Sequence, residues 1–274
     1  MLGAITGDVV GSPYEFNNHR STRFPLFPQE ADFTDDSVLT IAVAEAILED
    51  RPFHRALQDW YAQYPHCSYG GSFHNWARSG GSAPYGSWGN GSAMRVSPCG
   101  WAGSNEDEVL ELARNSAAVT HDHREGIKGA QAVALAIFLA RQGSSREHIA
   151  ARISRQFDYR LDHDLDQLRA YYEFDVSCQG SVPQAIACFL QAEDFEDTLR
   201  KAVSIGGDSD TIAAIAGAIA EAWFEGIPEE ILAPAWRRLP SELREVTAAF
   251  HERYDLPGQI PAPDEVPPEV LGGR

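Results

Sequence analysis

The most informative part of the sequence is Ser204-Ile-Gly-Gly-Asp-Ser-Asp-Thr-Ile-Ala-Ala-Ile-Ala-Gly-Ala-Ile-Ala-Glu-Ala222. Its two glycines allow a sharp turn, after which two carboxylates and a hydroxyl follow: Asp208, Asp210 and Thr211. Acidic and hydroxyl side chains are typical of the first turn of a helix, where free amides and the helix dipole favour them. The apolar residues that follow are spread around the whole helix, which predicts a buried helix. Buried carboxylates are costly without a positive partner, and a hard metal ion would supply one.

A second stretch, Phe33-Thr34-Asp35-Asp36-Ser37, has the same composition and precedes another apolar helical pattern over residues 38–48. If the two helix tips face each other, they supply four carboxylates and two threonine hydroxyls. Oxygen ligands of this kind favour Mg²⁺, Mn²⁺ or Ca²⁺ over zinc, and four carboxylates suffice for two divalent ions. The pattern alone leaves an alternative open, because Asp and Thr at a helix start also serve as plain caps.

The pair of motifs resembles the ADP-ribosylglycohydrolase family, the relatives of dinitrogenase-reductase-activating glycohydrolase. Further stretches of the chain are similar to that family in the same order: the small-residue helix 3–11 followed by Glu15-Phe16, the glycine-rich run 86–95, Thr120-His121, and residues 181–185. The resemblance covers roughly residues 1–230. It implies a dinuclear metal cleft in a single multi-helix domain.

This resemblance implies hydrolysis of the bond between the anomeric carbon of ADP-ribose and an acceptor, assisted by two Mg²⁺ or Mn²⁺ ions. The metal ligands that it implies are Thr34, Asp35, Asp36, Asp208, Asp210 and Thr211. Glu15 is expected to act on the water or the leaving group and to gate the site, and it forms the catalytic set with Asp36 and Asp210. The expected substrate contacts are Ser87, Trp88, Gly89, Asn90, Gly91, Met94 and His121.

Helical patterns dominate the chain and strand signals are almost absent, so we expect an all-α fold. Residues 65–103 are the exception, because they are rich in glycine and show little helical period. Their aromatic residues argue against disorder and favour a binding loop. We expect a helix over residues 184–192 with Pro183 at its first turn. We predict one catalytic domain over residues 1–256 and a proline-rich acidic tail over 257–274.

Composition limits the partners of the protein. A net charge of −18 argues against general binding of nucleic acid, although backbone amides and metals can still bind a phosphorylated small molecule. No apolar run is long enough to span a membrane, and the N-terminus lacks a signal-peptide pattern. The four cysteines show no paired spacing, so we expect reduced thiols in a cytoplasmic protein. We expect a monomer that acts on an ADP-ribosylated protein or small molecule.

The acceptor is the least determined part of the prediction. The resembled family includes enzymes that cleave arginine, serine, polymeric and other ADP-ribose bonds. A guanidinium acceptor would favour extra acids beside the site, and Asp8 is a candidate. Because the chain is acidic, we favour ADP-ribosyl-arginine on proteins, with serine, O-acetyl-ADP-ribose and nucleic-acid linkages as alternatives.

Two other classes of function compete with this interpretation. The Asp208-x-Asp210 pair is also similar to haloacid-dehalogenase-like phosphatases, but there a threonine follows one residue later and a strand precedes. A binding protein of the same fold without turnover is the other alternative. It is disfavoured because every acid of both motifs is present.

Overall fold

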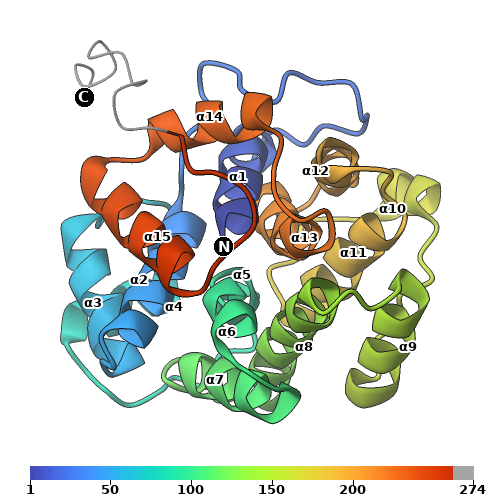
Figure 1. The fold of residues 1–274 in the computed structure, drawn as a ribbon. Helices are drawn as coiled ribbons and strands as arrows, with labels where there is room; N and C mark the ends of the chain where they lie inside the picture. The colour runs from blue at the N-terminus through green and yellow to red at the C-terminus, as the bar shows by residue number, and fades with distance from the viewer. Residues whose placement is uncertain (262–274) are drawn as a thin grey trace.

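In the computed structural model, which describes residues 1–261, helix α1 (Leu2–Gly11) lies directly against helix α13 (Ser209–Trp223) (Figure 1). Glycines recur every four residues of α1 and therefore share one face: Gly3, Gly7 and Gly11. A Cβ on Gly7 would lie only 2.1 Å from the carbonyl oxygen of Ala213. The two backbones can approach this closely because the contact face of α1 has no side chains.

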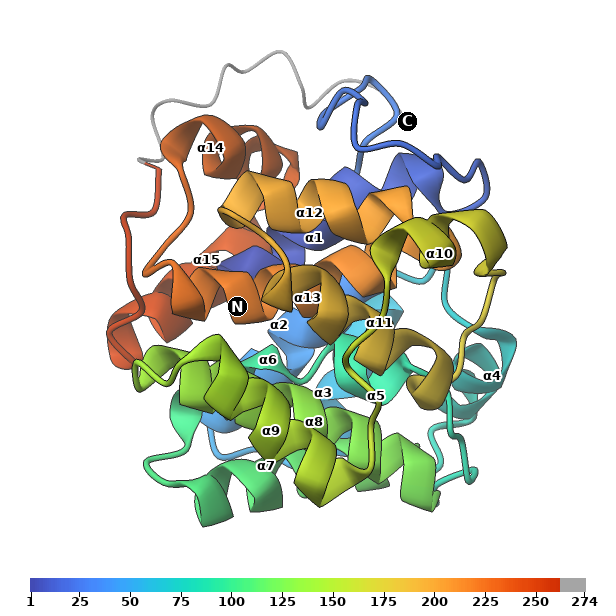
Figure 2. The same ribbon diagram turned by 90° about the vertical axis from the view of Figure 1, so that its right-hand side faces the viewer.

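Three helices cover much of the remaining surface of α13: α8 (Arg124–Arg141), α11 (Cys178–Leu190) and α12 (Phe195–Ser204) (Figure 2). Helix α8 is rich in alanine, which favours the helix and keeps the spacing to its neighbours short. Fourteen of the fifteen residues of α13 are buried, from Ser209 to Ala222. The expectation of a buried central helix is thus confirmed.

Helix α2 (Asp35–Leu48) packs beside α1 and carries the second acidic tip. The hydroxyl of Thr34 accepts a hydrogen bond from the amide of Asp36 at 3.3 Å and so caps the helix. Helices α3 (Phe53–Gln63) and α15 (Ser241–Arg253) pack against the outer side of α2.

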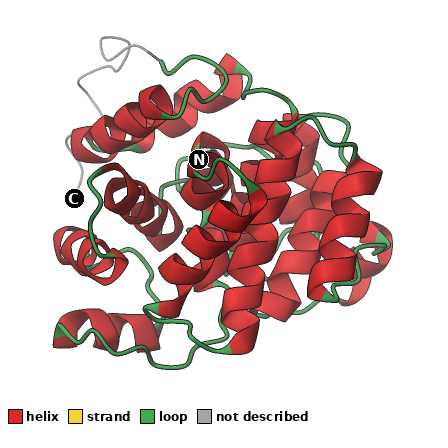
Figure 3. Ribbon diagram, turned by 60° about the horizontal axis from the view of Figure 1, so that its bottom comes forward, coloured by secondary structure: helices red, strands yellow, loops and turns green. Residues whose placement is uncertain are grey.

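The described chain is built from helices joined by loops, and no strand is drawn for residues 1–261 (Figure 3). The all-α prediction is therefore confirmed. The elements not yet named are η1 (Ser12–Tyr14), α4 (Gly71–Ser79), α5 (Gly91–Met94), α6 (Ser97–Ala102), α7 (Glu106–Ala118), α9 (Arg146–Phe157), α10 (Leu165–Tyr171) and α14 (Glu229–Arg238).

The prediction that residues 65–103 lack regular structure is wrong, because they contain α4, α5 and α6. These helices have nine, four and six residues, so each offers at most two repeats of a helical pattern. In α4 the pattern is present but short: Phe73, Trp76 and Ala77 are its buried residues. Glycines between the helices hid this signal in the sequence.

Helix α11 also begins earlier than predicted, at Cys178, and Pro183 lies inside it. The side chain of Ser177 accepts a hydrogen bond from the amide of Gly180 at 3.0 Å and fixes this early start. Proline removes one intrahelical bond, to the carbonyl four residues before it. That residue, Gln179, is exposed, so its carbonyl can be hydrated.

None of the helices within residues 1–261 combines the length and the apolar character that crossing a bilayer demands. The predicted catalytic domain, residues 1–256, falls entirely within the described part of the chain. Most of the predicted tail, residues 262–274, lies outside the described residues.

The glycine contact between α1 and α13 gives a first testable prediction. Gly7→Ala should lower the free energy of unfolding by about 3 kcal/mol or more, since a methyl group would clash with the backbone of α13. Chemical denaturation measures this change. Gly71→Ala is the matched control, because a Cβ at Gly71 meets no atom within 4 Å. Equal stability of the two variants would contradict the close backbone contact.

Candidate active site

The N-terminal tip of α13 carries the first pair of acids. Gly206 and Gly207 have φ angles of 72° and 77°, a left-handed conformation that other residues rarely adopt. This turn separates α12 from α13 and leaves Asp208 at the N-cap and Asp210 in the first turn. Both carboxylates are buried, as the sequence predicted for this tip.

The tip of α2 is held by Asp8 of α1. The carboxylate of Asp8 accepts hydrogen bonds from the amides of Thr34 (2.9 Å) and Ser37 (3.0 Å), and also from the hydroxyls of both residues. These four donors explain how a fully buried carboxylate is tolerated in α1. The buried carboxylate of Asp8 therefore joins α1 to the tip of α2, and the suggestion that it contacts a guanidinium acceptor is wrong.

Glu15 joins the acids of α13 from a distant part of the sequence. One carboxylate oxygen from each of Glu15, Asp208 and Asp210 lies within 4.8 Å of the other two. The second tip is connected directly to this group, because the hydroxyl of Thr211 donates to Asp36 Oδ2 at 3.0 Å. The two helix tips thus meet, as their matching composition suggested.

Burial and mutual repulsion raise the pKa values of these carboxyl groups. For Glu15, burial is the larger cause, the charges of Asp208 and Asp8 add to it, and the pKa rises to about 7. The pKa values of Asp35, Asp36 and Asp210 are raised well above their usual range, again first by burial and then by neighbouring carboxylates. Among the described residues, none of them forms an ion pair. Oxygen donors with unbalanced negative charge suit Mg²⁺ or Mn²⁺.

A cavity of about 450 Å³ adjoins these acids. Twelve of the fourteen predicted site residues line it: Glu15, Asp35, Asp36, Ser87, Gly89, Asn90, Gly91, Met94, His121, Asp208, Asp210 and Thr211. The other two are not in its lining. The hydroxyl of Thr34 donates to Asp8 at 2.7 Å, and the indole of Trp88 is 55% exposed and lies against His123.

The glycine-rich loop is attached to the start of α11. The amide of Asn90 donates to the carbonyl of Val176 at 2.7 Å, and the amide of Cys178 donates to that of Trp88 at 3.0 Å. The side-chain amide of Asn90 then donates to Asp208 Oδ2 at 2.7 Å. Asn90, a predicted substrate contact, therefore orients a carboxylate at the tip of α13.

His121 lies buried behind this loop, with its Nδ1 atom 2.7 Å from the hydroxyl of Thr120. Burial, followed by the charge of Arg95, pushes its pKa well below the usual range, so the imidazole is neutral near pH 7. Its other nitrogen faces Gly91, where an added Cβ would lie 3.3 Å from Nε2. His121 therefore offers the cavity a neutral polar edge.

No role was predicted for several residues that line the same cavity, among them Phe16, Ser68, Phe73, Tyr85, Arg95 and Phe174. Arg95 is fully buried, and its guanidinium donates to the carbonyl of Ser116 at 3.0 Å and to the hydroxyl of Thr120 at 2.8 Å. It is the one arginine or lysine in the described lining. Phe16 and Arg95 stood within recognisable motifs, whereas Phe174 carried no sequence signal.

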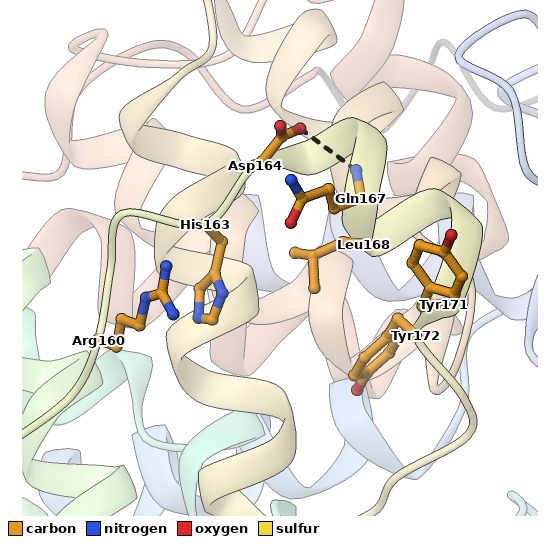
Figure 4. A pocket seen from close by; sticks show the side chains of 7 residues that line it. All are labelled: Arg160, His163, Asp164, Gln167, Leu168, Tyr171 and Tyr172. Atoms are coloured by element: carbon orange, nitrogen blue, oxygen red, sulfur yellow. Dashed lines mark hydrogen bonds between the residues drawn. The ribbon is translucent and has the colours of Figure 1, made fainter.

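A second cavity of about 350 Å³ lies beside α10 (Figure 4). Its one carboxylate, Asp164, caps α10 by accepting from the amides of Asp166 (2.9 Å) and Gln167 (3.2 Å). Since that side chain serves the helix and no acidic cluster accompanies it, the cavity between α2 and α13 is the candidate active site.

Known proteins resemble the chain over nearly its whole length. The sequence profile described as "ADP-ribosylglycohydrolase" matches residues 1–259. The mouse protein "ADP-ribosylhydrolase ARH3" is 31% identical, over 84% of this chain and 84% of its own length. "ADP-ribosylarginine hydrolase Tri1" of Pseudomonas putida is 23% identical, over 100% of this chain and 81% of its own length.

A solved structure has the same architecture. The "ADP-ribosylglycohydrolase-related protein complex" superposes with a TM-score of 0.69 at 25% sequence identity, covering 92% of this chain and 97% of that one. The chain therefore belongs to the ADP-ribosylglycohydrolase family, whose members are hydrolases that act on glycosidic bonds of ADP-ribose.

Proposed function

We propose that this protein is a metal-dependent hydrolase that releases ADP-ribose from modified acceptors. The observation that carries the proposal is the convergence of five carboxylates on one cavity: Glu15, Asp35, Asp36, Asp208 and Asp210. The glycine-rich loop contributes Ser87, Gly89 and Gly91 to the same cavity. Backbone amides of such a loop suit a pyrophosphate, and carboxylate-bound divalent ions suit ribose hydroxyls.

The residues that would hold two divalent ions are Thr34, Asp35, Asp36, Asp208, Asp210 and Thr211. The hydroxyl of Thr34 already donates to Asp8 and accepts from the amide of Asp36, so it retains a single lone pair. When bound, Mg²⁺ or Mn²⁺ would act as a Lewis acid for the ribose hydroxyls and for the attacking water. Asn90 would keep Asp208 in position for this role.

Glu15 is the cavity carboxylate that lies outside this ligand set, and we assign proton transfer to it. In the reaction, the bond between the anomeric carbon and the acceptor nitrogen or oxygen breaks with oxocarbenium-like character. The oxygen of water bonds to that carbon, the acceptor atom gains a proton, and ADP-ribose and the free acceptor leave. The neutral His121 and the loop amides would hold the ribose-phosphate portion.

For the acceptor we propose ADP-ribosyl-arginine on proteins, supported by the net charge of −18 and by the name of the Pseudomonas putida relative. The name of the mouse relative, which is more similar, states no acceptor. Serine, O-acetyl-ADP-ribose and nucleic-acid linkages are therefore the alternatives to compare. The net charge of −18 would disfavour the phosphate-rich last of these.

The proposal extends to the domain bounds, the oligomeric state and the cellular setting of the protein. Residues 1–256 would form the catalytic domain, and the protein would act as a monomer. All four cysteines are free, three of them buried, which supports a reducing, cytoplasmic setting.

The buried acids lead to a prediction about metal-dependent stability. At a hundredfold excess over Kd, Mg²⁺ or Mn²⁺ should stabilise the protein by about 2.7 kcal/mol and raise its melting temperature by several degrees. Asp36→Asn should remove this response and leave the metal-free protein as stable as the wild type or more so, since one repelling charge is lost. Differential scanning calorimetry with EDTA or metal measures both. The exposed acid Glu30, changed to Gln, is the control. A lower metal-free stability of Asp36→Asn with a normal metal response would contradict the assigned ligands.

The catalytic assignments predict that two variants, both with lowered turnover, will differ in metal binding. Asp210→Ala should abolish turnover and weaken metal binding while the protein stays folded. Glu15→Gln should lower kcat by roughly 10²–10⁴-fold but retain the metal-induced rise in melting temperature. Release of ADP-ribose is measured on arginine-linked, serine-linked and O-acetyl substrates with Mg²⁺, Mn²⁺ or EDTA.

Each outcome of that assay decides between the alternatives. Metal-dependent release from arginine supports the whole proposal, and release from another linkage alone removes the arginine assignment. ADP-ribose binding without any turnover would favour the non-catalytic binding protein. Full activity of Asp210→Ala would show that the metal ligands are assigned incorrectly.

A further inference from the structure

Two phenylalanines from distant segments stack on each other at the mouth of the acidic cavity. Phe16 follows η1 and Phe174 lies between α10 and α11, and their ring centroids are 6.2 Å apart with an interplanar angle of 24°. Both line the cavity, yet Phe16 is 81% exposed and Phe174 is 49% exposed. Large apolar side chains that are grouped and exposed at a cavity mouth mark a surface for a partner.

The segment that carries Phe16 is held firmly in place. The side-chain amide of Asn18 donates to the carbonyls of Glu15 (2.7 Å) and Gly207 (3.0 Å), and its oxygen accepts from the amide of Gly207 at 2.8 Å. The guanidinium of Arg20 donates to the carbonyl of Tyr172 at 2.7 Å, which joins this segment to the loop of Phe174. The exposed pair is thus supported by hydrogen bonds on both sides.

Acidic side chains are the immediate chain neighbours of the pair. Glu15 precedes Phe16, and the exposed acids Glu173 and Asp175 flank Phe174 in the chain. Two basic side chains on the same segments have protein partners, since Arg20 donates to main-chain carbonyls and Arg169 pairs with Asp166 at 2.5 Å, whereas Arg23 is exposed. An aromatic surface with an acidic border is complementary to an extended cation.

We propose that Phe16 and Phe174 form an acceptor-recognition platform that binds a cationic side chain, Arg or Lys, of a basic polypeptide carrying the ADP-ribose. This inference rests on the proposed function. Glu15, the assigned proton-transfer residue, is the neighbour of Phe16 in the chain, so the platform lies where the acceptor would leave the cavity. The guanidinium of arginine stacks well on aromatic rings, and the acids beside them retain the charge.

The test compares three conjugates of the linkage that the wild type hydrolyses fastest. One is a peptide with Lys and Arg beside the modified residue, the second has Glu in their place, and the third is a small conjugate without a polypeptide. We expect wild-type kcat/KM to be highest for the basic peptide. In the double variant Phe16→Ala and Phe174→Ala, the ratio of basic to acidic peptide should fall roughly 3- to 30-fold, mainly through KM.

Two further variants isolate aromatic contact and charge. Tyr171→Ala removes an aromatic side chain that is 83% exposed on α10 and lies beside the second cavity (Figure 4), so the ratio should not change. Glu173→Lys should lower the ratio while leaving the rings in place. Thermal unfolding of all variants should match the wild type, which excludes a purely structural effect.

Fluorescence anisotropy of the labelled conjugates, with metal present, tests the platform independently of turnover. Equal affinity for basic and acidic peptides, or an unchanged ratio in the double variant, would overturn the inference. Absence of hydrolysis with preserved preference for the basic peptide would overturn the proposed function alone. A wild-type dimer that the double variant loses in sedimentation velocity would show that the pair binds a second copy of the chain, and this too would overturn the inference.

Discussion

The backbones of α1 and α13 lie in direct contact, and this contact determines where the acids of the candidate site lie. Since glycines form the contact face, the end of α1 lies against the tip of α13, where an added Cβ on Gly11 would meet Cα of Asp210 at 2.4 Å. The chain leaves α1 at this point, so the short η1 turn delivers Glu15 to Asp208 and Asp210. One turn earlier in α1, the carboxylate of Asp8 accepts hydrogen bonds from amides at the tip of α2. A single short helix thereby gathers acids from three segments of the sequence.

The carboxylates of this region differ in how many hydrogen bonds they accept. Asp8 receives four hydrogen bonds, and its pKa rises only to about 6 despite complete burial. Asp35 and Asp36 have far fewer donors, and their pKa values rise well above the usual range. Hydrogen bonds thus satisfy the carboxylate that holds the helices together, whereas the carboxylates of the cavity are left with a charge that divalent ions can balance.

Much of this arrangement could be predicted from the sequence because it rests on local patterns. The two acidic tips precede apolar helices whose pattern extends over several turns, as in α2 and α13. Short helices within glycine-rich segments, such as the four-residue α5, contain too few turns to show a helical pattern. Contacts such as Asp8 with the tip of α2, or Phe16 with Phe174, depend on which segments the fold brings together, and no local pattern records them.

The clasp that Asn18 makes with Gly207 gives the site a built-in reporter. The amide hydrogen of Gly207 is bonded to Asn18 Oδ1, and the same side chain holds the carbonyl of Glu15. That amide can exchange with solvent deuterium only when its hydrogen bond to Asn18 breaks, and separation of the Glu15 segment from α13 would break it. The exchange rate of this backbone hydrogen would therefore report on local opening of the segment that carries Glu15, in the absence of any substrate.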